Sequence, residues 1–171
     1  MDTKLINRVA ASSIMILNLE DHYPTAMIHT IDLHDYLFQG MILREKDFRA
    51  ALKETDWTMY QDAYAVLYCR TDAIIPTWAY MLLSAQLEGV NCQAYHCTKD
   101  EFLNRYYQEA LSHIDWSVFQ DQRVVVKGCS TRDVPVSAYV EATRQLRTRA
   151  QSVMFGEPCS TVPVFKRPRK I

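Results

Sequence analysis

The segment "RVVVKGCSTRDVPVSAYVEATRQLRTRAQSVMFG" (residues 123–156) has the clearest alternation of strand and helix patterns in the chain. Its first segment, 123–129, is rich in valine and is stopped by Gly128, which indicates a strand. A helix is expected over 134–151, because the apolar residues recur at helical spacing and Pro135 fits only a first turn. The segment 152–156 is a second short strand. Because a helical connection between strands makes them parallel, the stretch predicts a right-handed strand–helix–strand unit.

The same alternation occurs earlier in the chain. It consists of a strand at 63–69, a helix at 74–89 and a strand at 91–97. Pro76 is tolerated only in a first turn, so Thr71 or Asp72 is expected as the N-cap of that helix. Thr98 and Glu101 have the spacing of a capping box, which opens a helix running from 98 to about 111.

The N-terminal part has a different pattern. "SIMILNLED" (13–21) and "TAMIHTIDL" (25–33) are candidate strands joined by a turn at "HYP", so a hairpin is expected. A short helix at 32–40 and an amphipathic helix at 44–54 follow.

These elements predict an α/β fold. We expect about four parallel strands with helical crossovers, arranged in three layers, plus an N-terminal hairpin-and-helix subregion. A single domain is expected over 1–171. It would comprise the subregion 1–56, a core of repeated strands and helices at 57–163, and a basic tail at 164–171.

Composition excludes several classes of protein. The chain has 171 residues, a formal net charge of -1 and four glycines. No global charge attracts it to nucleic acid or a membrane surface, and no glycine-rich phosphate loop is present. The N-terminal segment lacks an apolar run of the length of a signal peptide or a membrane span. Five cysteines without a Cys-x-x-Cys pair indicate free thiols in a reducing compartment, so a cytoplasmic protein is expected.

Cysteines follow all four core strands. They are Cys69, Cys97, Cys129 and Cys159. Ligands of an open parallel sheet bind beyond the carboxyl ends of its strands, so one edge lined by thiols is expected. Cys69 and Cys97 could instead be core residues that have no functional role, and Asp72 could be only a helix cap.

Cys129 and Cys159 are the stronger candidates for a functional thiol. Cys159 stands in "FGEPCSTVP" (155–163), where two prolines restrict the loop around the thiol. Thiolates here could hold zinc or iron, with Asp72 and Cys69 as further ligands, or one thiolate could act as a nucleophile. No arginine follows either cysteine at the spacing of a phosphatase loop, and the zinc-deaminase and Gly-x-Ser-x-Gly motifs are absent.

Five stretches carry a resemblance to a known family. They are "LREKDFR" (43–49), "TDAIIPTWAYMLL" (71–83), "VVVKGC" (124–129), "YVEATRQL" (139–146) and "MFGEPCSTVPVFK" (154–166). Together they resemble the uncharacterised bacterial domain-of-unknown-function family 2480, whose pattern covers Asp72, Cys129 and Cys159. The resemblance implies no activity. It implies a link to iron–sulfur assembly proteins as partners, because members often lie near iron–sulfur assembly genes.

Three hypotheses about function follow. The first is an accessory protein that handles metal or sulfur at a cysteine-lined site, linked to iron–sulfur cluster assembly. The second is an enzyme that uses one cysteine as nucleophile for sulfur or acyl transfer. The third is a non-catalytic protein-interaction module. The sequence leaves open whether the protein is an enzyme and whether it forms a homo-oligomer.

Overall fold

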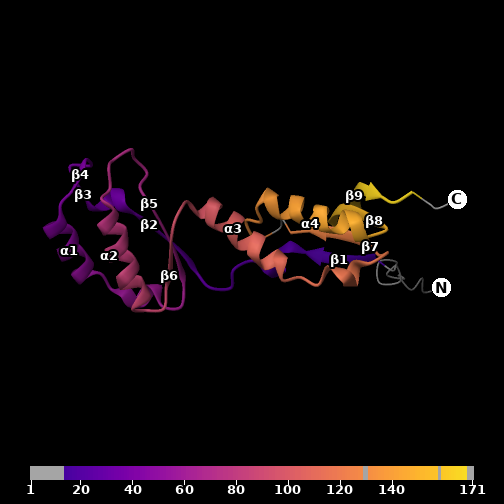
Figure 1. Cartoon of the computed structure of the whole chain (residues 1–171), viewed down its shortest axis with the longest axis horizontal. Helices are drawn as coiled ribbons and strands as arrows, with labels where there is room; N and C mark the ends of the chain where they lie inside the picture. The colour runs from indigo at the N-terminus through magenta and orange to yellow at the C-terminus, as the bar shows by residue number, and fades with distance from the viewer. Residues whose placement is uncertain (1–13, 129–130, 158, 169–171) are drawn as a thin grey trace, which may run out of the picture. The chain divides into compact units, whose positions relative to one another are not determined.

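The chain divides into two compact units (Figure 1). The computed structural model describes residues 14–128, 131–157 and 159–168. The inserted unit comprises residues 24–102, and the split unit comprises the residues on either side of it.

The split unit contains a four-stranded sheet in the order β1-β7-β8-β9. Its strands are β1 (Ile14–Asn18), β7 (Arg123–Lys127), β8 (Ser152–Glu157) and β9 (Ser160–Lys166). The first three are parallel, and β9 runs antiparallel to β8. The helices are α4 (Val136–Arg149) and, from Leu103 onward, α3 (Lys99–Ser112), whose first turn belongs to the inserted unit. Short 3₁₀ helices are η1 (Leu19–His22) and η4 (Trp116–Phe119).

The inserted unit contains a three-stranded parallel sheet in the order β2-β5-β6. Its strands are β2 (Ile28–Asp32), β5 (Tyr64–Tyr68) and β6 (Gln93–His96). The helices are α1 (Glu45–Glu54) and α2 (Thr77–Glu88), with 3₁₀ helices η2 (Leu33–Tyr36) and η3 (Trp57–Tyr60). A small antiparallel pair, β3 (Leu37–Phe38) and β4 (Ile42–Leu43), follows η2.

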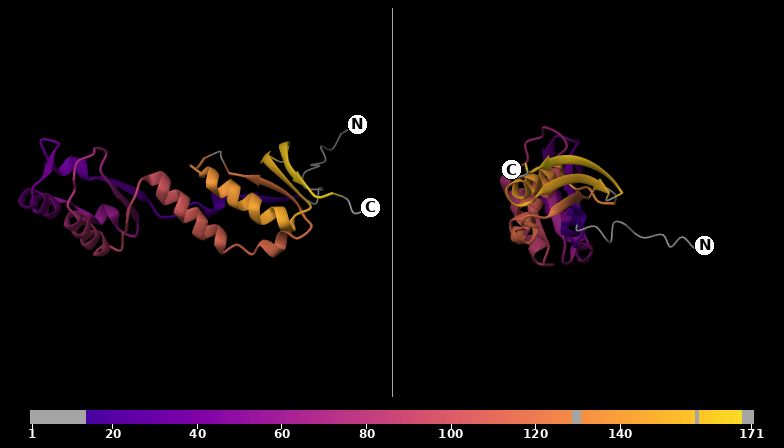
Figure 2. Two further views of the ribbon diagram at one scale, coloured as in Figure 1. Left: turned by 45° about the horizontal axis from the view of Figure 1, so that its top comes forward. Right: turned by 90° about the vertical axis from the view of Figure 1, so that its right-hand side faces the viewer.

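Each unit has its own hydrophobic core between its sheet and its helices. In the split unit, Leu17, Val124 and Val153 lie on one face of the sheet and pack with residues of α3 and α4. The strand order follows the chain order, so right-handed crossovers place both helices on that same face. Figure 2 shows this arrangement, with the β8–β9 ribbon at the outer edge of the sheet.

The two units repeat the same local structure. The indole N–H of Trp57 donates to the carbonyl of Leu52 (2.9 Å), and that of Trp116 donates to the carbonyl of Leu111 (3.1 Å). The preceding aspartates cap η3 and η4 in the same way. The spacing that separates Trp57 from Trp116 also separates the starts of β5 and β7, of α2 and α4, and of β6 and β8. The inserted unit is therefore a second copy of the strand–helix–strand–helix–strand topology of the split unit, without β9.

The α/β class with parallel strands and helical crossovers is confirmed. The prediction of one sheet was wrong, because β5 and β6 pair with β2 while β7 and β8 pair with β1. Each unit has two layers instead of the expected three, since its crossovers fall on one face of its sheet. Strand periodicity locates a strand but does not identify its neighbour, which explains the error.

Three local predictions also differ from the structure. The short helix expected at 32–40 is the 3₁₀ helix η2 followed by β3. The N-terminal hairpin does not form, because β1 and β2 belong to different sheets. The N-cap of α2 is Pro76 rather than Thr71 or Asp72, since the residues before it stay outside the helix. The capping box at Thr98 is confirmed, because Glu101 accepts from the Thr98 N–H at 2.8 Å. That the chain is one domain stays a prediction.

Candidate functional site

The cysteine-lined edge does not lie on one sheet. Cys69 follows β5 and Cys97 follows β6 in the inserted unit, whereas Cys159 lies beside β8 in the split unit. Cys129 lies outside the described residues. The carboxyl ends of the four strands therefore belong to two sheets, and the shared edge expected from the sequence is corrected.

Cys69 and Asp72 lie in or beside the connection from β5 to α2. The Cys69 sulfur is 3.4 Å from the Thr71 hydroxyl, and its side chain is partly buried. The Asp72 side chain is exposed and lies beside an open cavity of about 520 Å³ that Met41 and Ile74 also line. Within residues 14–128, 131–157 and 159–168, no group of three or more His, Cys, Asp or Glu side chains could hold a metal ion. The metal assignment to Cys129, Cys159, Asp72 and Cys69 stays a prediction.

Cys159 occupies the turn of a β-hairpin. Glu157 at the end of β8 pairs with Ser160 at the start of β9, so only two residues connect the strands. The Cys159 side chain is exposed there. The segment predicted as a loop over 157–163 is therefore mostly strand.

Gly156 explains how this hairpin forms. Its φ is +119°, and a Cβ at this position would lie 2.7 Å from the Ser160 carbonyl oxygen. Only glycine fits this close approach of the two strands without strain. The hairpin that presents Cys159 thus depends on a glycine two residues before the turn.

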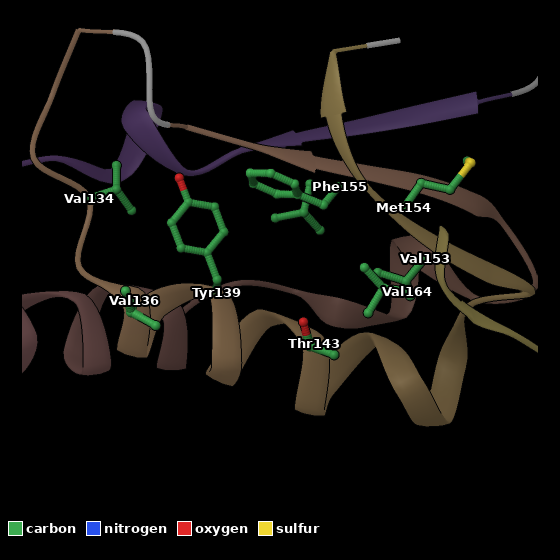
Figure 3. A pocket seen from close by; sticks show the side chains of 9 residues that line it. Val134, Val136, Tyr139, Thr143, Val153, Met154, Phe155 and Val164 are labelled. Atoms are coloured by element: carbon green, nitrogen blue, oxygen red, sulfur yellow. The ribbon is translucent and has the colours of Figure 1, made fainter. Parts of the chain in front are cut away.

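A groove lies between α4 and the β8–β9 hairpin (Figure 3). It is a cavity of about 440 Å³, open to solvent and almost entirely apolar. Its lining consists of Val126, Val134, Val136, Tyr139, Thr143, Val153, Met154, Phe155 and Val164. Figure 3 shows Tyr139 rising from α4 toward Phe155 of β8, and Val164 of β9 beside Val153.

The groove exists because β9 extends the sheet beyond its helices. The right-handed crossovers place α3 and α4 over β1, β7 and β8, and no helix follows β9 in the described chain. The pairing of β8 with β9 shifts register, so that Val153 pairs with Phe165 but Met154 pairs with Pro163. The extra residue is Val164, and such a bulge redirects a side chain. Val164 therefore joins Phe155 in the wall that faces α4.

The charged residues lie at the two ends of the groove. At the hairpin end, the Lys127 ammonium pairs with the Glu157 carboxylate at 3.4 Å. At the other end, the Arg147 guanidinium lies 4.3 Å from the centre of the Phe165 ring. Arg147 follows Thr143 by one turn of α4, so it continues the helix side of the groove.

The connections after β5 and β7 are anchored by carboxylates. The Asp32 carboxylate accepts from the backbone N–H of His34 and from the Arg70 side chain at 2.8 Å. Burial raises the pKa of Asp32, but these hydrogen bonds and the Arg70 charge outweigh it and hold the pKa below its ordinary value. In the split unit, Glu20 accepts from the backbone N–H of Thr131 at 2.8 Å. These carboxylates fix loops rather than form an acid–base pair.

The groove is not among the sites expected from the sequence. The valines and phenylalanine of "STVPVFK" (160–166) are typical of a strand, but Pro163 favours a loop. Val136 and Val140 are exposed apolar residues of α4. Their exposure becomes evident only when the sheet is known.

Fold and groove define an α/β protein of two repeated units, one of which carries an apolar groove beside an edge hairpin. Residues 3–167 match the family described as "Protein of unknown function (DUF2480)", and the chain belongs to that family. Neither a curated protein nor a solved structure matches it. No helix in the described part of the chain combines the length and apolar character needed to cross a membrane.

Proposed function

We propose that the protein is a non-catalytic interaction module that binds an apolar segment of a partner protein in the groove between α4 and the β8–β9 hairpin. The observation that carries this proposal is the exposure of large apolar side chains on both sides of the groove. Val136 and Val140 of α4 are 77% and 64% exposed, and Val162 and Val164 of β9 are 61% and 50% exposed. Clustered apolar exposure of this kind marks an interaction surface.

The occupant is a protein segment rather than a small molecule. A small ligand is largely enclosed by its pocket, which covers most of its surface. Here the groove is open, and Val140 and Val162 extend the apolar surface beyond the cavity itself. A surface of this extent is covered by a chain that lies along it. The five cysteines, for which no disulfide is predicted, support a cytoplasmic location for this interaction.

A random ten-residue peptide library displayed on phage tests the proposal. The full-length protein is immobilised, and retained peptides are sequenced and resynthesised. We expect enrichment of peptides with several apolar residues. V164D should weaken their binding at least tenfold, because it removes an apolar contact and leaves an unpaired carboxylate under the bound peptide. No enrichment over an empty surface would overturn the proposal.

V118D is the matched control. Val118 is 52% exposed, close to Val164, and it lies in η4 of the same unit but does not line the groove. V118D should bind the selected peptides as the wild type does. Circular dichroism of both variants shows whether they fold. Should V164D fail to fold, V164S provides the same comparison with less disturbance.

A second candidate is the thiol function at Cys129 and Cys159. The exposure of Cys159 at the hairpin turn favours it, because Cys92 is buried and Cys69 and Cys97 are partly buried. The role would be metal or sulfur handling linked to iron–sulfur cluster assembly, or nucleophilic transfer. For nucleophilic transfer, Cys159 of the wild-type protein should react with iodoacetamide at neutral pH much faster than Cys159 of the C129S variant, as expected when Cys129 activates it. Anaerobically purified protein should contain zinc or iron that C159S lacks, and equal metal content in both would contradict the metal role.

A further inference from the structure

The groove ends in unpaired positive charge. Arg147 lies over the Phe165 ring at the end of the groove away from the hairpin turn, and its side chain is exposed. No carboxylate within the described residues forms an ion pair with it. Two other carboxylates of the same helix and hairpin already have partners, since Glu141 pairs with Arg144 at 2.7 Å and Glu157, at the opposite end of the groove, pairs with Lys127.

From this charge arrangement we infer that the partner segment carries a carboxylate directly after its apolar residues, and that Arg147 binds it. The inference rests on the proposed function and specifies the chemistry of the partner. The Phe165 ring holds the guanidinium by a cation–π contact, and its N–H groups remain available to a carboxylate. Apolar residues would fill the groove from Val136 to Thr143, and the acidic group would meet Arg147.

The length of α4 along the groove sets the size of the segment. From Val136 to Arg147 the helix rises roughly 16 Å at about 1.5 Å per residue. An extended peptide covers that distance with about five residues at roughly 3.3 Å each. We therefore expect about four residues in the apolar part, followed by Asp, Glu or a terminal carboxylate.

The phage selection separates this inference from the proposed function. Selected peptides should show Asp or Glu at one end of the apolar run. A selected peptide is then compared with its Glu→Gln or Asp→Asn analogue. The acidic form should bind about threefold more tightly in dilute buffer, as expected for one exposed ion pair, and the difference should disappear at about 1 M salt. Apolar peptides without an acidic preference would overturn the inference while the proposed function stands.

R147Q assigns the effect to one side chain. It should remove the difference between the acidic peptide and its neutral analogue, and R147K should retain most of it. R144Q is the matched control, because Arg144 lies on the same helix and carries the same charge but is bound to Glu141. Equal loss of the difference in R147Q and R144Q would contradict a role for Arg147 and indicate only the general charge of α4.

Discussion

The Tyr139 ring of α4 meets the Phe155 ring of β8 edge to face, with their centroids 5.7 Å apart. The equivalent positions in the inserted unit hold Tyr80 and His96, whose rings also meet edge to face at 4.6 Å. Both units thus use an aromatic pair to join the second helix to the end of the third strand. The split unit adds β9 to this arrangement, and there the aromatic pair forms part of a groove with a hairpin wall.

F155A should weaken peptide binding by about tenfold or more. Phe155 is 39% exposed, so part of its ring faces the groove while the rest packs on Tyr139. Losing that contact should also lower the free energy of unfolding by about 1–2 kcal/mol. Peptide affinity and urea denaturation measure the two effects. F38A is the control, since Phe38 is 40% exposed in the inserted unit, and equal loss of binding in F38A would argue against the groove.

G156A should open the hairpin. The added Cβ would lie too close to the Ser160 carbonyl oxygen, and the φ of +119° at residue 156 is unfavourable for alanine. This strain should lower the free energy of unfolding by about 1–3 kcal/mol. Hydrogen exchange should show faster exchange of β9 amides, and peptide binding should fall with it. Unchanged exchange in β9 would show that the hairpin does not depend on this glycine. G89A is the comparison, because Gly89 has a helical backbone conformation.

The Asp32 carboxylate makes stability depend on pH. Its pKa in the folded protein lies below the ordinary value of 3.8, so it stabilises the fold above that value and loses the contribution as pH falls through the lowered pKa. D32N should cost about 1–3 kcal/mol near neutral pH, because the bonds from Arg70 weaken.

Urea denaturation at several pH values checks this expectation. The stability of the wild type should fall more steeply between about pH 5 and pH 2 than that of D32N. D72N is the control, since Asp72 is exposed in the following loop. Parallel curves for the wild type and D32N would contradict the role of Asp32.

The three tryptophans test whether the chain is one domain. Trp116 belongs to the split unit, whereas Trp57 and Trp78 belong to the inserted unit. Fluorescence of a W57F/W78F variant reports the split unit, and that of W116F reports the inserted unit. Each curve is compared with the circular-dichroism curve of the same variant, which reports both units. A single domain requires that the two curves of each variant coincide. Separate midpoints would show two domains.

The local elements could be predicted from the sequence, and their assembly could not. The strand at 123–129 and the helix at 134–151 were placed within a few residues of β7 and α4, because valine runs and helical spacing are local signals. The pairing of β7 with β1 instead of β6 depends on contacts between distant segments, which periodicity does not encode. The repeat does leave a sequence signal, because "DWTMYQD" (56–62) and "DWSVFQD" (115–121) are similar and precede corresponding strands.

The candidate site was predicted only in part. The sequence directed attention to 155–163, and the groove does lie there, but through Phe155 and the hairpin rather than through Cys159 alone. Exposure decides which apolar residues bind a partner, and it follows from the position of β9 at the edge of the sheet. That position results from the two-residue turn after Glu157, and the bulge at Val164 directs that side chain toward α4. Neither feature is specified by composition or spacing.

Methyl NMR of valine-labelled protein shows whether the peptide binds in the groove. A phage-selected peptide is titrated into the full chain, and the valine methyl signals are followed. We expect the signals of Val136, Val140, Val162 and Val164 to shift together with one dissociation constant, while that of Val118 does not shift. Shifts at Val118 with none at Val164, or uniform small shifts over all valines, would contradict binding in the groove.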